Sequence, residues 1–338
     1  MKMFRRIIYS SILLIISATQ IPAQDIHFSQ YMHSPLNLSP AGTGFFDGDV
    51  RANAVYRSQW NSITVPYNTF SFAYDQVIGK IAPTGSRSAV GLLVNNDRAG
   101  DGNLGTLQLM VSFAKLFAIG NDSIHFINAG IQGGFAYRTI DFNRLTFDNQ
   151  FNGDVFDATI SSGEQFEKDN YIYPDFNAGI AWLGLFENTQ YSAGISMQHI
   201  NKPDVSFLNE TVKLPVHWQL YSSVWLRKQD MISFNPSIIY MAQQEFRELT
   251  GGLEIKVNLN GESARIYSFG AGCHYRWDDA IIPNAAIYYN QWRFGLSYDI
   301  NISDLNHASN GRGGPEFNVT YIMKKIRYVA RKNNCPVY

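Results

Sequence analysis

Hydrophobic and polar residues alternate along most of this chain with a period of two. Successive side chains of a β-strand point to opposite faces, so this pattern predicts strands with one apolar face and one polar face. It is clearest in residues 290–301 and recurs in 49–61 and 214–227, and no stretch from residue 49 onward has a convincing helical period. In 290–301 the apolar face comprises Trp292, Phe294, Leu296, Tyr298 and Ile300, and the other face Gln291, Arg293, Gly295, Ser297 and Asp299.

The alternating stretches are longer than the strands of most soluble proteins. Soluble strands average about five or six residues, whereas a tilted strand that crosses a bilayer needs about nine to eleven. A soluble secreted β-protein also shows alternation, so length is what favours an all-β, transmembrane, antiparallel up-and-down β-barrel. About fourteen strands are expected, an even number that suits a single-chain bacterial barrel. They lie at 49–60, 66–77, 87–96, 104–117, 123–139, 172–186, 189–200, 214–227, 230–241, 246–258, 264–276, 280–289, 290–300 and 315–326.

The lengths of the connections give a second indication of a barrel. Bacterial outer-membrane barrels have short turns on the periplasmic side and longer loops outside, whereas a soluble sandwich has no reason to follow this parity. The links obey it with one exception, residues 78–86, a longer link on the inner side. If the first strand rises from the periplasm, the long links 140–171, 201–213 and 301–314 lie outside, and the tight links at 187–188, 228–229 and 290 lie inside.

Both ends of the chain lie outside the predicted strands. Residues 1–23 are typical of a secretory signal peptide for Sec-dependent export, with a basic start, an apolar run and a cleavage site after Ala23. The run is too short for a membrane anchor, which needs about 20 residues, and no later run reaches that length. Residues 24–48 are too polar for a lipid-facing strand, so we expect them to form a plug or lid in the lumen. The barrel then covers 49–326, and the basic tail 327–338 emerges into the periplasm.

Composition agrees with a membrane barrel and argues against a nucleic-acid partner. Aromatic residues make up 14% of the chain and charged residues only 16%, against roughly 25% charged residues in soluble domains. Such a composition suits a sheet whose outer face meets lipid and whose rims lie among headgroups. The formal net charge is -1, which provides no electrostatic attraction for a polyanion. Two cysteines, Cys273 and Cys335, are too few for a disulfide framework or a zinc site, and we expect both to stay unpaired.

No motif indicates a catalytic reaction, a metal site or a cofactor. Phosphate loops, Ser-centred elbows and paired metal-binding histidines have no match, and the 7 His are scattered. Residues 97–103 and 148–154 each resemble half of a calcium loop but lack the carboxylate at the bidentate position, so a polar turn is favoured for both. Asp278 and Asp279 are a poor catalytic pair, because neighbours on a strand point to opposite faces and these lie at a predicted turn. We therefore expect a protein that is not an enzyme.

Charged residues on the inward face of the predicted barrel are the main candidate site. They fit a selectivity lining or partner-docking surface. They also fit a network that neutralises itself and holds the plug, which is favoured because an unpaired charge in a confined lumen is costly. The candidate lumen charges are Arg51, Arg57, Asp75, Arg276, Arg293 and Asp299, and the aromatic residues Trp60, Trp182, Trp277 and Tyr289 near strand ends are expected to form an interface girdle.

Specific runs of residues, which follow one another along nearly the whole mature chain, carry a family resemblance. The first are Gln24-Asp25-Ile26-His27-Phe28-Ser29-Gln30-Tyr31-Met32, Ser34-Pro35-Leu36 and Ser39-Pro40-Ala41-Gly42. Later runs are Tyr56-Arg57-Ser58-Gln59-Trp60, Asn96-Asp97, Pro174-Asp175, Tyr191-Ser192-Ala193-Gly194-Ile195-Ser196, Tyr275-Arg276-Trp277 and Phe294-Gly295-Leu296-Ser297-Tyr298-Asp299. Together they resemble the PorP/SprF family of the type IX secretion system in Bacteroidetes. The chain departs from the resemblance at its end, where Cys335-Pro336-Val337-Tyr338 replaces the expected Cys-Pro-Arg-Phe.

The resemblance implies a FadL-like barrel of about fourteen strands in the outer membrane. It implies a role in docking, secreting or retaining cargo proteins, such as gliding adhesins, at the cell surface. The implied partners are other type IX components, including periplasmic ring or peptidoglycan-linked proteins, the cargo C-terminal domain and the lipid bilayer. The alternative function is a FadL-like or porin-like channel for small solutes. The candidate residues for plug or partner contacts in the opening run are His27, Phe28, Ser29, Gln30, Tyr31 and Pro35.

Overall fold

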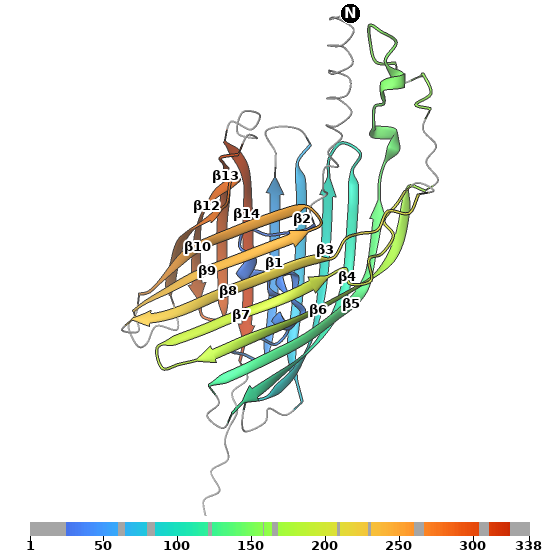
Figure 1. Cartoon of the computed structure of the whole chain (residues 1–338). Helices are drawn as coiled ribbons and strands as arrows, with labels where there is room; N and C mark the ends of the chain where they lie inside the picture. Colours follow the sequence, from blue (N-terminus) through green and yellow to red (C-terminus); the bar gives the residue numbers. More distant parts are fainter. Residues whose placement is uncertain are drawn as a thin grey trace, which may run out of the picture.

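Antiparallel strands close into a single barrel in this computed structural model (Figure 1). The structure describes residues 25–59, 65–79, 85–120, 124–157, 159–163, 168–207, 210–228, 231–259, 267–303 and 311–324. Each strand pairs with its neighbours in sequence, and the first strand pairs with the last to close the ring. The described strands are β1 (Val50–Gln59), β2 (Tyr67–Ile78), β3 (Arg87–Ala99), β4 (Leu104–Ile119), β5 (His125–Thr139), β6 (Asn170–Leu185), β7 (Thr189–Gln198), β8 (His217–Lys228), β9 (Ile232–Gln243), β10 (Phe246–Asn258), β11 (Ser268–Arg276), β12 (Ala280–Tyr289), β13 (Trp292–Asn301) and β14 (Arg312–Met323). Short helices are η1 (Tyr31–His33), α2 (Pro35–Leu38), η2 (Pro40–Gly42), η3 (Phe142–Arg144) and η4 (Asp148–Gln150).

The predicted barrel is confirmed, and the strand ends differ from the predicted ends by a few residues. β7 ends at Gln198, before the predicted end at 200, because His199 adopts a φ of 57° that lies outside the strand region. β3 continues past the predicted end at 96, since its last residues stay paired with the start of β4. The predicted signal peptide 1–23, the tail 327–338, Cys335 and Trp60 lie outside the described residues.

The alternation in sequence becomes an apolar outer face and a polar inner face. Burial alternates at every residue of β13, and its inward side chains include Arg293 and Asp299. On other strands Leu109, Ile131 and Ile172 are among the apolar side chains that are more than half exposed. A contiguous apolar surface of this kind is unfavourable in water and favourable in lipid. Among the described residues, no helix is both long and apolar enough to cross a membrane.

The connections between strands gather at two ends of the barrel (Figure 1). We call the end with links 140–169 and 199–216 the loop end, and the opposite end, where β1 begins and β14 ends, the turn end. The shortest turn-end links, such as 186–188, agree with the predicted parity. The parity is incomplete, because the turn end also has the longer links 79–86 and 259–267.

Residues 25–49, here called the N-terminal segment, run through the lumen from the loop end to the turn end. At the loop end, Asp25 bonds to His199, which follows β7 directly. At the turn end, Lys324 donates to Asp47 just after β14. Helices η1, α2 and η2 of this segment lie inside the ring of strands (Figure 1). The segment therefore lies in the lumen, and its role as a plug or lid stays a prediction.

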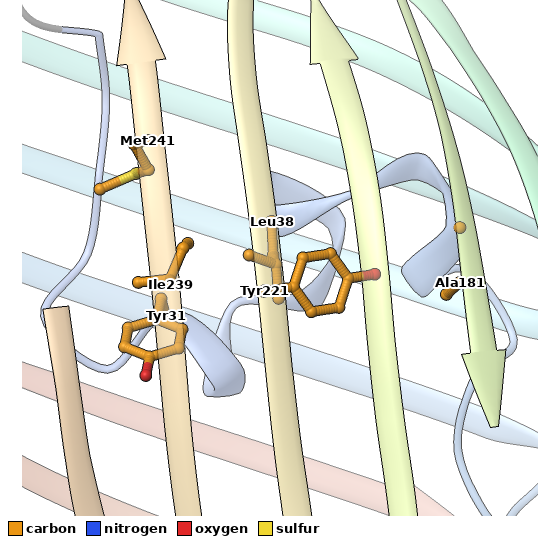
Figure 2. Packing of buried hydrophobic residues seen from close by; sticks show 7 residues of the cluster. Tyr31, Leu38, Ala181, Tyr221, Ile239 and Met241 are labelled. Atoms are coloured by element: carbon orange, nitrogen blue, oxygen red, sulfur yellow. The ribbon is translucent and has the colours of Figure 1, made fainter. Parts of the chain in front are cut away.

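Two small apolar clusters pack the N-terminal segment against the wall. Burial of such side chains stabilises a packed state by about 25 cal/mol per Å² of apolar area. In the first cluster Tyr31, Leu38 and Ala41 of the segment lie against the wall residues Ala181, Tyr221, Ile239 and Met241 (Figure 2). In the second cluster Leu36 packs with Ala73, Leu93 and Met110 of β2, β3 and β4.

Proline, serine and glycine residues set the path of the segment past the wall. Pro35 and Pro40 occupy the first positions of α2 and η2, where the missing N–H has no helical partner to lose. Ser39 caps η2, because its Oγ accepts a hydrogen bond from the N–H of Ala41 at 3.1 Å. At Gly130 the wall touches the main chain of the segment, since a Cβ there would lie 2.3 Å from the carbonyl oxygen of Pro40.

We expect Gly130→Ala to weaken the hold of the barrel on the N-terminal segment. The added methyl group must push the Pro40 carbonyl away, and overpacking of this kind costs about 1–3 kcal/mol. The measurement is the midpoint of thermal unfolding of the purified barrel, which should fall. Gly251→Ala is the matched control, because the nearest atom to its added Cβ would be 3.7 Å away. Equal midpoints for the two variants would contradict the close approach at Gly130.

Candidate functional site

The six predicted lumen charges are all buried in the barrel interior, each with 7% or less of its surface exposed. They do not form one cluster. Their side chains separate into a loop-end group and two groups closer to the turn end. The three groups are Arg57 with Arg276 and Asp299, Arg51 with Asp75, and Arg293 with Glu254, a residue that the sequence analysis did not select.

The loop-end group forms a network around Asp299. Arg57 Nη2 and Arg276 Nη1 donate to the same carboxylate oxygen of Asp299 at 2.8 and 3.1 Å. From the N-terminal segment, Ser29 Oγ donates to the other oxygen at 2.6 Å. Arg57 Nη1 in turn donates to the carbonyl of His27 at 2.6 Å. A buried ion pair is stable only when its remaining donors and acceptors are also bonded, and the segment supplies part of these bonds.

Glu316 completes this network and was not selected from the sequence. Its carboxylate has no exposed surface and accepts hydrogen bonds from the N–H groups of Ser29 at 2.7 Å and Gln30 at 2.8 Å. Glu316 lies directly opposite Arg57 in the β1–β14 pair, and its Oε2 is 4.0 Å from Arg57 Nε. The signal that identifies it is the alternation of Glu316 with the outward Phe317 in the predicted strand 315–326.

Arg51 and Asp75 form a bidentate pair near the turn end. They lie opposite each other in β1 and β2, and Arg51 Nε and Nη2 donate to the two Asp75 oxygens at 2.9 and 2.8 Å. Asp75 also accepts from the N–H of Gly44 at 2.7 Å, and Arg51 Nη2 donates to the carbonyl of Gly42 at 2.7 Å. The guanidinium lies 4.5 Å from the ring centre of Phe46. This pair therefore clamps the last part of the N-terminal segment.

Arg293 belongs to a third polar group. Its Nη2 lies 3.3 Å from Glu254 Oε2, and its Nη1 donates to Asn318 at 3.0 Å. Glu254 also accepts from the hydroxyl of Tyr288 at 2.8 Å and lies 3.4 Å from His33 Nε2. Burial lowers the pKa of His33, and the charge of Arg293 lowers it further while Glu254 opposes the shift. This group therefore links the N-terminal segment to β10 and β13.

Uncharged wall side chains bind the main chain of the N-terminal segment between the ion pairs. Asn128 Nδ2 donates to the carbonyls of Ala41 and Thr43 at 2.6 and 3.0 Å. Ser196 Oγ donates to the carbonyl of Leu38 at 2.8 Å. Buried main-chain carbonyls need a donor, and helices as short as these satisfy few of them. Further bonds of this type run from Gln198 to Asn37 and from Asn318 to His33. Uncharged side chains of this kind are not distinguished by the alternating pattern of the sequence.

The six candidate contact residues of the segment lie against the wall, and none of them is exposed. Tyr31 donates or accepts a hydrogen bond with Ser237 Oγ at 2.9 Å. His27 Nε2 is 3.8 Å from Glu248 Oε2, and burial lowers the pKa of His27 to about 4. A role in partner contact would therefore require the segment to move. The most deeply buried of the six are Phe28, Ser29, Gln30 and Tyr31, whereas His27 and Pro35 are half-buried.

Asp25, His199 and Asp175 form a cluster that we call the loop-end latch. His199 Nε2 lies 2.7 Å from Asp25 Oδ2, and its Nδ1 lies 2.9 Å from Asp175 Oδ1. His217 Nδ1 is 3.5 Å from the same Asp25 oxygen. Burial alone would lower the pKa of His199, but the two carboxylates outweigh it and raise the pKa to about 10. Burial alone would raise the pKa of Asp25, but His199 outweighs it and holds that pKa well below its usual value.

Two of the other acidic residues considered from the sequence have side-chain partners. Asp97 lies within β3 and accepts from Thr69 Oγ1, and Asp279 accepts from Arg276 Nη1. Cys273 is free and exposed on β11. Across the part of the chain that the structure describes, no group of three or more His, Cys, Asp and Glu residues is placed to hold a metal ion.

We expect the loop-end latch to weaken as the pH rises. His199 has a raised pKa, so its contribution is complete below the unfolded-state pKa of about 6.5 and is lost as the pH rises through about 10. Asp25 has a lowered pKa, so its contribution is present above about 3.8 and is lost at lower pH. A spin label at Ile26 should therefore be immobile near pH 6 and gain mobility steadily towards pH 10. His199→Gln should abolish this dependence, and constant mobility in the unaltered latch up to pH 10 would contradict it.

We expect Glu316→Gln to release the segment at Ser29 and Gln30. The amide nitrogen of glutamine would face a main-chain N–H, and a buried donor left without an acceptor costs about 1–3 kcal/mol. The measurement is amide hydrogen exchange at Ser29 and Gln30, which should accelerate. Lys324→Met is the control, because the Lys324–Asp47 pair is exposed and contributes little. The role assigned to Glu316 is wrong if both variants exchange alike.

Solved structures of similar fold include outer-membrane transporters. The toluene transporter TbuX from Ralstonia pickettii has a TM-score of 0.51 and 10% sequence identity, with 86% of this chain and 92% of that chain covered. The toluene transporter TodX from P. putida has a TM-score of 0.50 and 10% identity, with 86% and 93% covered. A FadL homologue from Pseudomonas aeruginosa has a TM-score of 0.46 and 11% identity, with 84% and 92% covered. At 10% identity the likeness to TbuX and TodX shows the fold alone.

The family comparison is more specific than the structural one. No curated protein matches the chain. The model of the family described as "Type IX secretion system membrane protein PorP/SprF" matches residues 21–321. The match includes the N-terminal segment and nearly all of the barrel. This chain belongs to the PorP/SprF family of type IX secretion system membrane proteins.

Proposed function

We propose that this protein is an outer-membrane component of the type IX secretion system that docks, secretes or retains cargo proteins at the cell surface. Membership of the PorP/SprF family supports the assignment to this secretion system. The observation that favours docking over solute transport is the filled lumen. The N-terminal segment runs the length of the barrel. At the loop end Asp25 pairs with the buried His199, and near the turn end the buried Arg51–Asp75 pair hydrogen-bonds to the main chain of the segment. The barrel would then act as a scaffold fixed in the membrane, with its binding surface at the rim.

In this proposal the loop end faces the cell exterior and the turn end faces the periplasm. A chain exported by the Sec pathway, with residues 1–23 removed, enters the outer membrane from the periplasm, and bacterial barrels keep their short turns on that side. The tail 327–338 would meet periplasmic ring or peptidoglycan-linked components. Cargo, gliding adhesins included, would meet the loop end. Link 140–169 or the N-terminal segment would hold the cargo's C-terminal domain by strand addition or surface complementarity.

A FadL-like or porin-like channel for small solutes is the second candidate. Its support is the fold shared with the toluene transporters TbuX and TodX. The cavities beside the segment weigh against it. One, of about 220 Å³, lies at the loop end beside Glu248 and Arg276, and another, of about 90 Å³, lies beside Glu254 and His274. A third cavity shares His27 with the first and Tyr31 with the second, but its volume of about 20 Å³ is too small to pass a solute, which would have to displace the segment.

Deletion of the gene should leave one surface protein trapped in the envelope or lost, while other exported proteins continue to reach their destination. The expected reason is that the cargo loses its docking site in the outer membrane. The measurement is the amount of each type IX substrate on intact cells, in the envelope and in the medium, with a plasmid-borne copy of the gene as the control. Loss of small-solute uptake with secretion intact would favour the channel instead.

A further inference from the structure

The link between β5 and β6 has a small hairpin at residues 147–157, here called the tip hairpin. Phe151 and Phe156 form an antiparallel bridge across it. Asn152 Oδ1 accepts hydrogen bonds from the N–H groups of Asp154 and Val155, both at 3.0 Å, and so closes the turn. In Figure 1 this link rises well beyond the rim of the barrel at the loop end.

The tip hairpin is ordered by its own hydrogen bonds. Gln150 Oε1 accepts from the N–H of Phe147 at 3.1 Å, and Gln150 Nε2 donates to the carbonyl of Ile160 at 3.1 Å. Asn149 Nδ2 donates to the carbonyl of Ser162 at 3.0 Å. A surface that is already ordered loses less conformational entropy when it binds. The hairpin is therefore shaped for contact before any partner arrives.

Three large apolar side chains of the tip hairpin are exposed. Phe151 is 56% exposed, Val155 60% and Phe156 47%. Apolar side chains on the strands face lipid, but this hairpin lies beyond the strands (Figure 1). An ordered and exposed apolar cluster of this kind is typical of a surface that becomes buried in a complex, and aromatic anchors supply most of the binding energy of such surfaces.

The charge within residues 148–157 of the tip hairpin has a single sign. Residues 148–157 contain Asp148, Asp154 and Asp157 and no Lys or Arg, so their formal charge is −3. The basic residue nearest in sequence, Arg144, pairs with Asp141 at 3.2 Å. An acidic surface repels anionic lipid headgroups. Small molecules are bound in concave sites, whereas this hairpin projects into solvent.

We propose that the tip hairpin docks into an apolar cleft with a basic rim on a folded protein outside the barrel. Phe151, Val155 and Phe156 fill the cleft, and Asp148 and Asp154 pair with Lys or Arg on its rim. The inference rests on the proposed function and deepens it: the docked protein is the cargo, and the cleft belongs to its C-terminal domain. The acidic charge and the projecting apolar surface of the tip hairpin favour this partner over lipid and over a solute.

A photo-cross-link in living cells tests the position of the contact. Benzoylphenylalanine replaces Phe151 in the full-length protein, and in the matched control it replaces Val212, a 49% exposed apolar residue in another link at the same end. Irradiation should give an adduct with the epitope-tagged cargo from position 151 and not from 212. Asp148→Asn with Asp154→Asn should reduce that adduct roughly threefold. Adducts with lipopolysaccharide alone, or none, would overturn the proposal.

A serine variant tests the function of the apolar cluster. Phe151→Ser, Val155→Ser and Phe156→Ser together should release the cargo from intact cells into the medium, with at least about a tenfold loss of surface-bound cargo. Heat-modifiable migration checks that the barrel still folds, and Ile200→Ser with Val212→Ser is the matched control. If gene deletion traps the cargo but the triple variant retains it normally, the tip proposal alone is wrong. If gene deletion has no effect on any cargo, the proposed function itself fails.

Discussion

An ionised side chain inside a narrow lumen needs both a counter-ion and a full set of hydrogen bonds, and the rest of this structure depends on that constraint. Arg57, Asp299 and Glu316 are each 3% exposed or less. The strands supply the counter-ions, but Ser29 and Gln30 of the N-terminal segment supply donors to both carboxylates. Without the segment, Asp299 and Glu316 would lose these donors, and a buried carboxylate with unsatisfied oxygens is costly. The barrel and the segment therefore stabilise each other.

The N-terminal segment in turn depends on the barrel wall for hydrogen bonds to its main chain. Its helices contain only three or four residues, so their carbonyls find few partners within the segment. Asn128 and Ser196 donate to these carbonyls instead, and Gly130 allows the wall to approach the main chain closely. A lumen occupied in this way offers little room for a ligand. Under the proposed function, recognition of another protein then takes place at the rim, and the loop end has the long links 140–169 and 199–216 there.

Alternation predicted the strands and their inward charges because a period of two is a local property of the sequence. It identified Arg57 and Asp299 as lumen residues before their partners were known. Local sequence patterns could not predict the hydrogen-bond partners of these charged residues. Ser29 and Glu316 are 287 residues apart, and their contact depends on how the ring closes and on the path of the segment. The loop-end latch could not be predicted for a related reason. His199, the residue directly after β7, has a positive φ, and no repeating sequence pattern indicates such a residue.

Closure of the ring and seating of the N-terminal segment are energetically coupled. β1 follows the segment directly in the chain and pairs with β14, and Arg57 on β1 lies opposite Glu316 on β14. Glu316 has its donors from Ser29 and Gln30 only when the segment is seated, and its counter-ion only when β1 and β14 are paired. Groups that share a hydrogen-bond and ion-pair network in this way do not contribute additively to the free energy of unfolding. Under the proposed function this coupling has a further consequence. A wall fixed by the seated segment holds the loop-end links in one geometry, and a pre-ordered binding surface loses less entropy on docking.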